Sequence, residues 1–307
     1  IGRNTVTRKF NTILKQFIAT AAVAAFFMFS TGGAFAQTKT LRMATWLPPM
    51  HSLIKTLDRW GQEVSKASGG SLKVEIMKAP LAKPPGQYDL VKKNVTDLAW
   101  SVAAWSPKRF HLFRGIDMPF LFSSAEVGSA GLWDWYSKNK FADKEFTDSK
   151  LVGAYVNPPH LYHSRKKLTV LNDLKGQKIR AGGYGIGILK KLGAAPLFLN
   201  PPSTTQALQK GTIDGTQFPW EALKGFRLVK YSKYHLVIPN GLYTNAWWLS
   251  MSNKSWGSLT STQKNAINAV GLSGSRLIGK GWDESEAAGK NAAIKAGNTI
   301  TVLGDAD

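Results

Sequence analysis

The feature that most constrains the fold of this chain is a repeated change between two spacings of apolar residues. Segments 40–45, 72–77 and 97–103 are short and either apolar or alternately apolar and polar, which is typical of β-strands. Between them, segment 52–64 carries apolar residues at helical spacing, and segment 88–93 predicts a second helix. Strands that alternate with helices form parallel sheets with crossover helices, and such sheets bind ligands beyond the carboxyl ends of their strands.

The same alternation resumes after an aromatic and proline-rich middle region. Further strands are expected at residues 151–156, 178–181, 196–199, 215–218 and 299–303, and further helices at residues 186–192 and 204–210. A helical tail begins after the capping residue Thr260, although glycines at positions 271, 274, 279 and 281 weaken a single continuous helix. No repeat or low-complexity linker interrupts these elements, so any second domain is interleaved with the first.

The first 36 residues have the three parts of a secretory signal peptide. A basic start precedes a 13-residue apolar run, and Ala34-Phe35-Ala36 is the pattern after which signal peptidases cleave. A membrane anchor is the alternative interpretation, but it needs about 20 apolar residues. We therefore expect cleavage before Gln37 and export to the periplasm.

Charge and cysteine content exclude several classes of protein. The chain has 307 residues and a net charge of +21; its first 36 residues contain four Lys and Arg and no Asp or Glu, so the remainder carries +17. Because an exported protein rarely meets nucleic acid, this charge indicates a solvated basic surface or attraction of small anions, and no nucleic-acid partner. The absence of cysteine excludes disulfide bonds, thiolate metal sites and cysteine catalysis.

The sequence contains no recognisable catalytic or cofactor-binding motif. The glycine-rich segment 182–187 resembles a dinucleotide-binding loop, but its spacing fails at Ile188. His160 and His163 lie three residues apart without a nearby carboxylate or third ligand, which favours a structural or ligand-hydrogen-bonding role over zinc binding. We expect no enzymatic activity, no cofactor and no bound metal.

Arg180 stands out because it lies in an apolar strand immediately before a glycine-rich turn. Its guanidinium can project into a cleft and bind a carboxylate through two hydrogen bonds, or it can form an internal salt bridge, and the strand pattern favours neither. Seven aromatic residues also lie near predicted strand ends, and two or three of them are expected to line a ligand pocket. These residues are Trp46, Trp100, Trp105, Phe218, Trp220, Trp247 and Trp248.

Three motifs, in their order and spacing, resemble those of the solute-binding proteins of TRAP (tripartite ATP-independent periplasmic) transporters. They are residues 173–180 (DLKGQKIR), residues 191–194 (KLGA) followed by Pro196, and residues 207–215 (ALQKGTIDG), with further matches at residues 118–122 and 255–259. The resemblance implies an α/β fold with two lobes of the Venus-flytrap type, joined by hinge strands and a long C-terminal helix. Such lobes close over a small organic anion, which is delivered to a membrane permease driven by an ion gradient.

The resemblance assigns the carboxylate clamp to Arg180, because this arginine occupies the family's Lys-Ile-Arg motif. Phe218 replaces an asparagine that is common in the family, which argues against a C4-dicarboxylate and favours a monocarboxylate with an apolar or aromatic body. A second family arginine has no counterpart here, and His160 and Tyr162 are the candidates to replace it. The remaining residues expected at the site are Gln217 and Trp220 from one lobe and Trp46, Trp100 and Asn245 from the other.

The resemblance also suggests how the lobes divide the chain. Lobe I comprises residues 37–157 and 244–287, and lobe II comprises residues 158–243 and 288–307. Family members usually continue for a few dozen residues beyond the last strand, so the chain is expected to be truncated or its second lobe unusually bare. The family implies a monomer. The alternative functions are a periplasmic enzyme acting on an organic acid and a sensory protein that presents its ligand to a receptor.

Overall fold

The computed structural model describes residues 38–239 and 241–304. The expected signal peptide lies outside these residues. None of the helices within the two described ranges combines the length and the apolar character that a membrane span requires.

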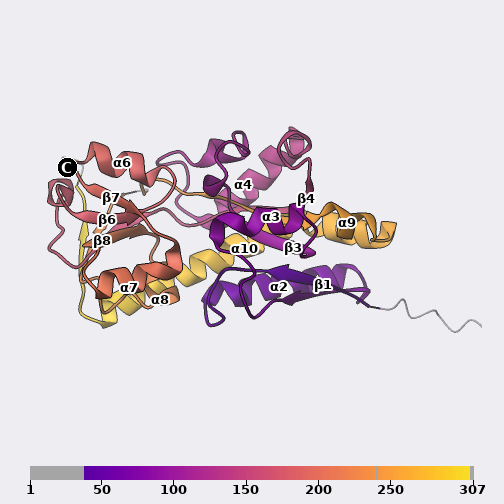
Figure 1. Ribbon diagram of the computed structural model, residues 1–307, viewed down its shortest axis with the longest axis horizontal. Coiled ribbons are helices and arrows are strands. Elements are labelled where there is room, and N and C mark those ends of the chain that lie inside the picture. The colour runs from indigo at the N-terminus through magenta and orange to yellow at the C-terminus, as the bar shows by residue number, and fades with distance from the viewer. Residues whose placement is uncertain (1–37, 240, 305–307) are drawn as a thin grey trace, which may run out of the picture. The chain divides into compact units, whose positions relative to one another are not determined.

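Sheet A contains five strands in the order β2-β1-β3-β10-β4 (Figure 1). β1 pairs in parallel with β2 and β3, whereas β10 runs antiparallel between β3 and β4. The four strands expected in this part of the chain are confirmed, and β10 has no counterpart among the expected segments. The strands are Lys39–Ala44 (β1), Leu72–Ile76 (β2), Leu98–Val102 (β3), Ser149–Val156 (β4) and Ala246–Ser252 (β10).

Sheet B contains six strands in the order β11-β9-β5-β8-β6-β7. β6 pairs in parallel with β7 and β8, and β11 pairs in parallel with β9, whereas β5 runs antiparallel to both β8 and β9. Four of these strands are confirmed expectations; β5 and β9 were not expected. The strands are Leu161–Ser164 (β5), Lys178–Ala181 (β6), Ala195–Phe198 (β7), Gly215–Phe218 (β8), Tyr234–Val237 (β9) and Thr299–Val302 (β11).

Each sheet therefore has one antiparallel strand, so both sheets are mixed, whereas parallel sheets were expected. β5 follows β4, and β10 follows β9, so both antiparallel strands come directly after the chain has crossed to the other sheet. The first residue of β5, Leu161, pairs with Phe218, the last residue of β8. A strand that enters a sheet at the edge where its neighbours end must run against them, since no helix intervenes to bring the chain back to the opposite edge.

Helices cover both sheets, and the expected ones are α2, α3, α6, α7 and α10. α2 buries Leu53, Leu57 and Trp60 on one face, as its apolar spacing predicts, and the ring of His51 caps its first turn by accepting a hydrogen bond from the backbone N–H of Leu53. The helices are Ser52–Ala67 (α2), Gln87–Lys92 (α3), Ala125–Lys138 (α4), Ala142–Glu145 (α5), Gly185–Lys191 (α6), Thr204–Gln209 (α7), Glu221–Gly225 (α8), Asn253–Gly257 (α9) and Ser261–Lys295 (α10).

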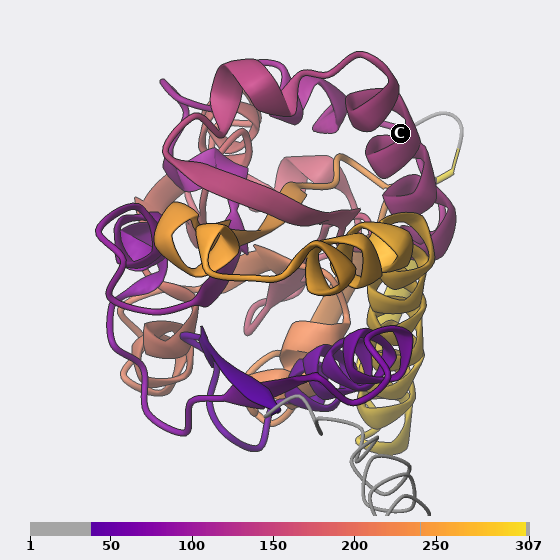
Figure 2. The same cartoon turned by 90° about the vertical axis from the view of Figure 1, so that its right-hand side faces the viewer.

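α10 is one continuous helix of 35 residues that runs beside α2 and α4 and continues to α8 (Figures 1 and 2). Thr260 caps its first turn, as expected. Its glycines do not break it, because several of them lie where another backbone comes close. A Cβ atom at Gly279 would overlap the carbonyl oxygen of Ala125 in α4, and one at Gly289 would overlap that of Trp220 next to α8. These glycines lower helix propensity but allow close packing with two neighbouring helices.

Two extended crossovers connect the sheets. Residues 157–160 join β4 to β5, and residues 238–239 and 241–245 belong to the connection from β9 to β10. The backbone N–H of His160 donates to the carbonyl oxygen of Tyr243 at 3.0 Å, and the backbone N–H of Asn245 donates to Oδ1 of Asn157 at 3.1 Å. The crossovers therefore lie side by side, and they place polar side chains between the two sheets.

Candidate functional site

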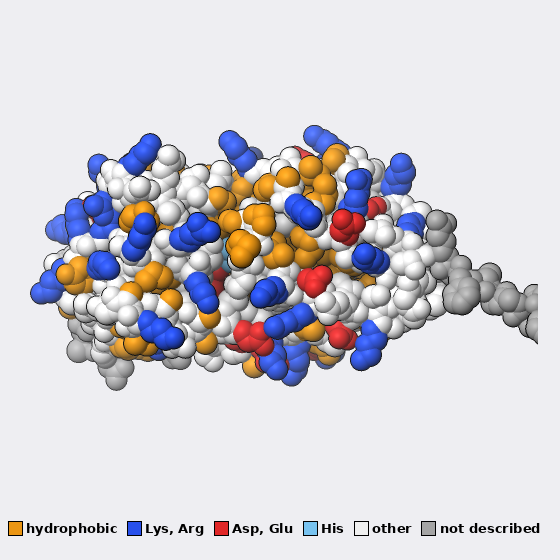
Figure 3. Space-filling view, turned by 90° about the horizontal axis from the view of Figure 1, so that it is seen from below, with side chains coloured by type: hydrophobic (Ala, Val, Ile, Leu, Met, Phe, Trp, Pro, Cys, Tyr) orange, Lys and Arg blue, Asp and Glu red, His pale blue; other side chains and the backbone are white. Residues whose placement is uncertain are grey.

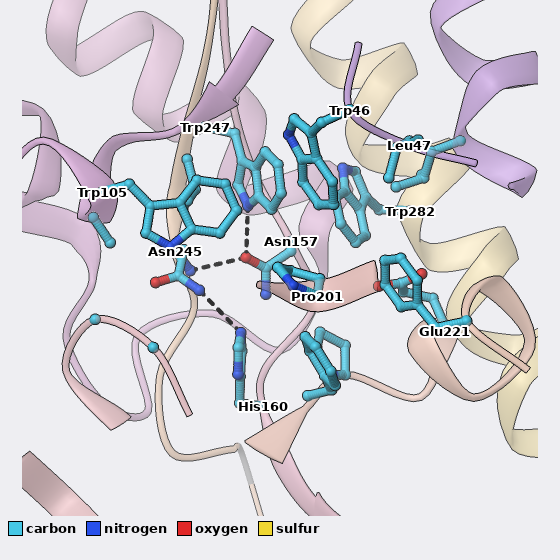
Figure 4. A pocket seen from close by; sticks show the side chains of 18 of the residues that line it. Trp46, Leu47, Trp105, Asn157, His160, Pro201, Glu221, Asn245, Trp247 and Trp282 are labelled. Atoms are coloured by element: carbon cyan, nitrogen blue, oxygen red, sulfur yellow. Dashed lines mark hydrogen bonds between the residues drawn. The ribbon is translucent and has the colours of Figure 1, made fainter. Parts of the chain in front are cut away.

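A cavity lies between the sheets, beyond the carboxyl ends of β1, β3, β6 and β8. The space not occupied by atoms amounts to about 580 Å³ when the part that opens to solvent is included. Figure 4 shows how crossover residues and residues from both sheets surround it. The position agrees with the expectation that ligands bind beyond the carboxyl ends of the strands.

Arg180 provides the positive charge of the cavity. β6 lies between β7 and β8, so the arginine near its end is 3% exposed. Its Nε donates to the carbonyl oxygen of Leu199 at 3.0 Å, and Nη1 lies 3.4 Å from the carbonyl oxygen of Gln217. Within the described part of the chain, no Asp or Glu forms an ion pair with this guanidinium. The internal salt bridge that the strand pattern left open is thus not formed there.

Burial also affects the pKa of this guanidinium. It lowers the pKa of Arg180 to about 9, so the side chain still carries its charge at neutral pH. A buried charge without an opposite charge is costly, and this cost is relieved when an anion binds to it. The arrangement therefore favours an anionic ligand, and a carboxylate fits the two parallel N–H groups of the guanidinium fork.

Aromatic rings of Trp and Phe residues line the cavity together with Arg180. The ring of Trp46 stacks on Trp247 with 6.0 Å between centroids and on Phe226 with 6.4 Å, and it meets Trp105 edge to face at 5.5 Å. All four residues line the cavity. Flat, apolar surfaces of this kind suit an aromatic or otherwise apolar ligand body.

Asn157, His160 and Asn245 provide neutral hydrogen-bonding groups from the crossovers (Figure 4). Oδ1 of Asn157 accepts from the indole Nε1–H of Trp247 at 2.8 Å, which holds this ring in the wall. Nδ2 of Asn245 donates to Nε2 of His160 at 3.0 Å. Burial and the nearby charge of Arg180 lower the pKa of His160 to about 3, so the imidazole is neutral at physiological pH.

A second polar group, His51 with Glu221, lines another part of the cavity. Nε2 of His51 lies 3.4 Å from Oε2 of Glu221, and neither atom has a hydrogen-bond partner in the described structure. Desolvation lowers the pKa of His51 to about 4. Desolvation, with a smaller contribution from nearby Glu286, raises the pKa of Glu221. Both groups therefore favour their neutral forms.

The structure brings five of the nine expected site residues to the cavity surface and places the other four behind it. Trp100 supports the wall from behind, since its ring stacks on Trp247 at 5.0 Å and its Nε1–H donates to Thr45. Tyr162 lies in the core on one face of sheet B. Trp220 belongs to the other hydrophobic cluster and packs against His163 and His235. Gln217 accepts a hydrogen bond from the hydroxyl of Tyr243 and reaches Arg180 only through its backbone carbonyl. The five that line the cavity are Trp46, His160, Arg180, Phe218 and Asn245.

Several cavity residues were not among the expected ones. His51 and Glu221 each follow the carboxyl end of a strand by a few residues, a position from which they were predictable. Phe226 and Trp282 carry no such signal, because α8 and the middle of α10 reach the cavity only through tertiary packing. Within residues 38–239 and 241–304, no group of three His, Asp or Glu side chains is arranged as a metal site.

Comparison with known proteins identifies the family. Residues 43–307 match the model of the bacterial extracellular solute-binding proteins, family 7. The chain belongs to this family. A curated relative of the family 7 protein, the outer membrane transporter protein TsaT of Comamonas testosteroni, is 24% identical over 275 residues, which are 88% of this chain and 81% of the relative.

Solved structures of TRAP solute-binding proteins share the fold of this family 7 protein. One from Bordetella bronchiseptica, with bound (R)- and (S)-mandelate, has a TM-score of 0.82 and 27% identity, covering 87% of this chain and 86% of its own. One from a marine metagenome, described as specific for aromatic acid ligands and bound to 3-hydroxybenzoate, has a TM-score of 0.80 and 32% identity, covering 87% and 86%. The predicted two-lobed α/β fold with a long C-terminal helix is confirmed.

The prediction of a TRAP solute-binding protein is confirmed as well. Proteins of this kind are periplasmic, bind small organic acids and work with membrane permease components. They are binding proteins of transporters rather than enzymes.

Proposed function

We propose that this protein captures an aromatic monocarboxylate in the periplasm and delivers it, as a monomer, to the membrane permease of a TRAP transporter. The carboxylate binds to the guanidinium of Arg180, and the ring of the solute lies against Trp46 and Trp247. The observation that carries this proposal is a protonated arginine, 3% exposed and without an acidic partner in the described chain, at an aromatic cavity.

The charge of the cavity favours a monocarboxylate over a dicarboxylate. Arg180 is the one Lys or Arg among the cavity-lining residues of the described chain. A second carboxylate would lie among neutral groups and beside Glu221, where no positive charge offsets its desolvation. Phe218 adds to this preference, because its ring occupies the position at which the family often has a polar side chain.

Known ligands of similar proteins support the proposal. The Bordetella bronchiseptica protein holds mandelate, and a protein from Rhodoferax ferrireducens, 29% identical with a TM-score of 0.80, holds copurified benzoate. Both ligands are single carboxylates on an aromatic body.

We further propose that sheets A and B are the centres of two lobes that close over the solute. Lobe I then comprises residues 37–157 and 244–287, and lobe II comprises residues 158–243 and 288–307. The two crossovers, which run side by side, act as hinge strands. Signal-peptide cleavage before Gln37 releases the protein into the periplasm.

Titration calorimetry with a panel of acids tests the proposal. The panel contains benzoate, mandelate, succinate, glucuronate and the uncharged analogue benzamide, each titrated into the wild type and Arg180→Met. We expect the aromatic monocarboxylates to bind most tightly and the substitution to weaken them at least about tenfold, because a charged hydrogen-bonded pair contributes about 1.5–3 kcal/mol. Tighter binding of succinate or benzamide, or equal binding of benzoate by both proteins, would contradict the proposal.

A further inference from the structure

His51 and Glu221 form a buried polar pair whose hydrogen-bonding capacity the described chain leaves unused. The residues are 2% and 4% exposed, and both line the cavity. Nε2 of His51 and Oε2 of Glu221 lie 3.4 Å apart, yet neither makes a hydrogen bond within the described structure. Buried polar atoms are nearly always hydrogen-bonded, so an unpartnered pair on two residues that line a cavity points to a polar group of a ligand.

The pair lies away from Arg180, at the other end of a row of rings. The guanidinium stacks on Phe218, the ring of Phe218 stacks on Phe226 at 5.9 Å, and the ring of Phe226 meets that of His51 at 5.0 Å. Figure 4 shows Glu221 on the side of the cavity opposite Asn245 and Trp105. A ligand whose carboxylate binds to Arg180 and whose ring extends along this row would bring the far end of its ring toward the pair.

The hydrogen-bonding roles of the pair follow from its other contacts. Nδ1 of His51 accepts from the backbone N–H of Leu53, so the proton of the neutral imidazole is on Nε2, which is a donor. Glu221 supplies an acceptor oxygen at 3.4 Å from this donor. A hydroxyl group can accept from one and donate to the other, whereas an ammonium group only donates and an ether oxygen only accepts.

We propose that His51 and Glu221 form a subsite for a hydroxyl group on the ring of the solute, at a position remote from its carboxylate. This inference rests on the proposed function and specifies its substrate class: hydroxylated aromatic monocarboxylates. The hydroxyl accepts a hydrogen bond from Nε2–H of His51 and donates one to a carboxyl oxygen of Glu221. A site built in this way discriminates against an analogue without the hydroxyl, because the buried pair then stays unpaired.

The test compares 4-hydroxybenzoate with 4-methylbenzoate, which are similar in size and differ in hydrogen bonding, by titration calorimetry. We expect the wild type to bind the hydroxy acid at least about tenfold more tightly, and Glu221→Leu to lose or reverse this preference. Glu286→Gln is the matched control, because Glu286 lies next to Glu221 but does not line the cavity and its replacement retains the acceptor oxygen. This control should keep the preference. 2-Hydroxybenzoate, whose hydroxyl stays beside Arg180, should gain little over benzoate.

The outcomes separate this inference from the proposed function. Equal binding of the two acids by the wild type, while Arg180→Met still loses benzoate, would overturn the subsite and leave the proposed function intact. If Glu221→Leu weakens the binding of both acids equally, the pair only holds the two sides of the cavity together, and this result also overturns the subsite. If no aromatic acid binds the wild type, both proposals fail. Should Glu221→Leu not fold, as judged by its melting curve, His51→Phe removes the donor instead and carries the same expectation.

Discussion

The guanidinium carbon of Arg180 lies 3.9 Å from the centre of the Phe218 ring, an arrangement in which an aromatic face takes the place of an acidic partner. The attraction between the cation and the ring offsets only part of the cost of burial. Backbone carbonyls of Leu199 and Gln217 accept two of the guanidinium hydrogen bonds. The arginine is thus held in place while its charge stays uncompensated, which is the state an incoming carboxylate would stabilise.

Arg180→Met should weaken ligand binding much more than it changes the stability of the ligand-free protein. Binding of benzoate should weaken at least about tenfold, whereas the free energy of unfolding without ligand should change little, because the removal of an uncompensated buried charge offsets the loss of the hydrogen bonds to the carbonyls of Leu199 and Gln217. Thermal melts with and without benzoate measure both effects. A large loss of stability without ligand would show that the hydrogen bonds of Arg180 contribute more than the burial of its charge costs, which contradicts the expectation.

Asn157→Ala should destabilise the protein by about 2–4 kcal/mol, because it leaves two buried N–H groups, one of Trp247 and one of Asn245, without an acceptor. Denaturant unfolding measures the change. Asn200→Ala is the control, since Oδ1 of Asn200 has no hydrogen-bond partner in the described structure, and it should cost less than about 1 kcal/mol. Similar losses in the two variants would show that the hydrogen bonds of Asn157 contribute nothing particular.

Glu286→Gln should become more stabilising, relative to the wild type, as the pH rises. Desolvation is the main cause that raises the pKa of Glu286 to about 8. Asp283 adds to the rise, whereas the backbone N–H groups of Trp220 and Glu221 and the charge of Lys290 oppose it. The native state therefore holds a proton that the unfolded chain releases near pH 4.5, so the stability of the wild type falls as the pH rises from about 4.5 to 8. Glutamine does not titrate. Melting temperatures across this range measure the difference, and a difference independent of pH would refute the assignment.

Gly289→Ala should destabilise the protein by about 1–3 kcal/mol, because its Cβ would overlap the backbone of Trp220 and force α8 away from α10. Gly187→Ala provides the matched control. Gly187 also lies inside a helix, α6, but a Cβ atom there would meet nothing within 4 Å. The higher helix propensity of alanine should therefore raise the free energy of unfolding by up to about 1 kcal/mol. Chemical denaturation measures the free energy of unfolding of both variants. It should fall in Gly289→Ala and rise in Gly187→Ala, and changes of the same sign would contradict the expectation.

The association rate of benzoate should fall as the ionic strength rises. Residues 158–243 contain 13 Lys and Arg and three Asp and Glu, and on the face shown in Figure 3 the end of the molecule that holds sheet B displays many Lys and Arg side chains. A positive potential attracts anions to the cavity, and salt screens it over about 10 Å at 0.1 M. Stopped-flow tryptophan fluorescence at several salt concentrations measures the rate. A rate indifferent to salt would exclude electrostatic steering.

Local sequence patterns predicted most elements but not the direction of all strands. Periodicity identified β1–β4, β6–β8 and β11, and the cap at Thr260 marked the start of α10. β5, β9 and β10 lack such a signal, because their side chains are buried by neighbours that are distant in sequence. The antiparallel direction of β5 and β10 follows from where the chain crosses between sheets, which no local pattern records.

The candidate site divides in the same way. By itself the sequence determined that an arginine ends a strand before glycines and that aromatic residues gather near strand ends, because these are properties of neighbouring residues. Only the tertiary structure decided which of these side chains face the cavity: Phe218 does and Gln217 does not, since adjacent residues in a strand point to opposite sides. It also decided that Arg180 has no acidic partner among the described residues and that His51 meets Glu221. Both findings depend on which segments pack together in the folded chain; His51 and Glu221, for example, are 170 residues apart in the sequence. This packing is set by the burial of apolar side chains throughout the molecule, which no local pattern records.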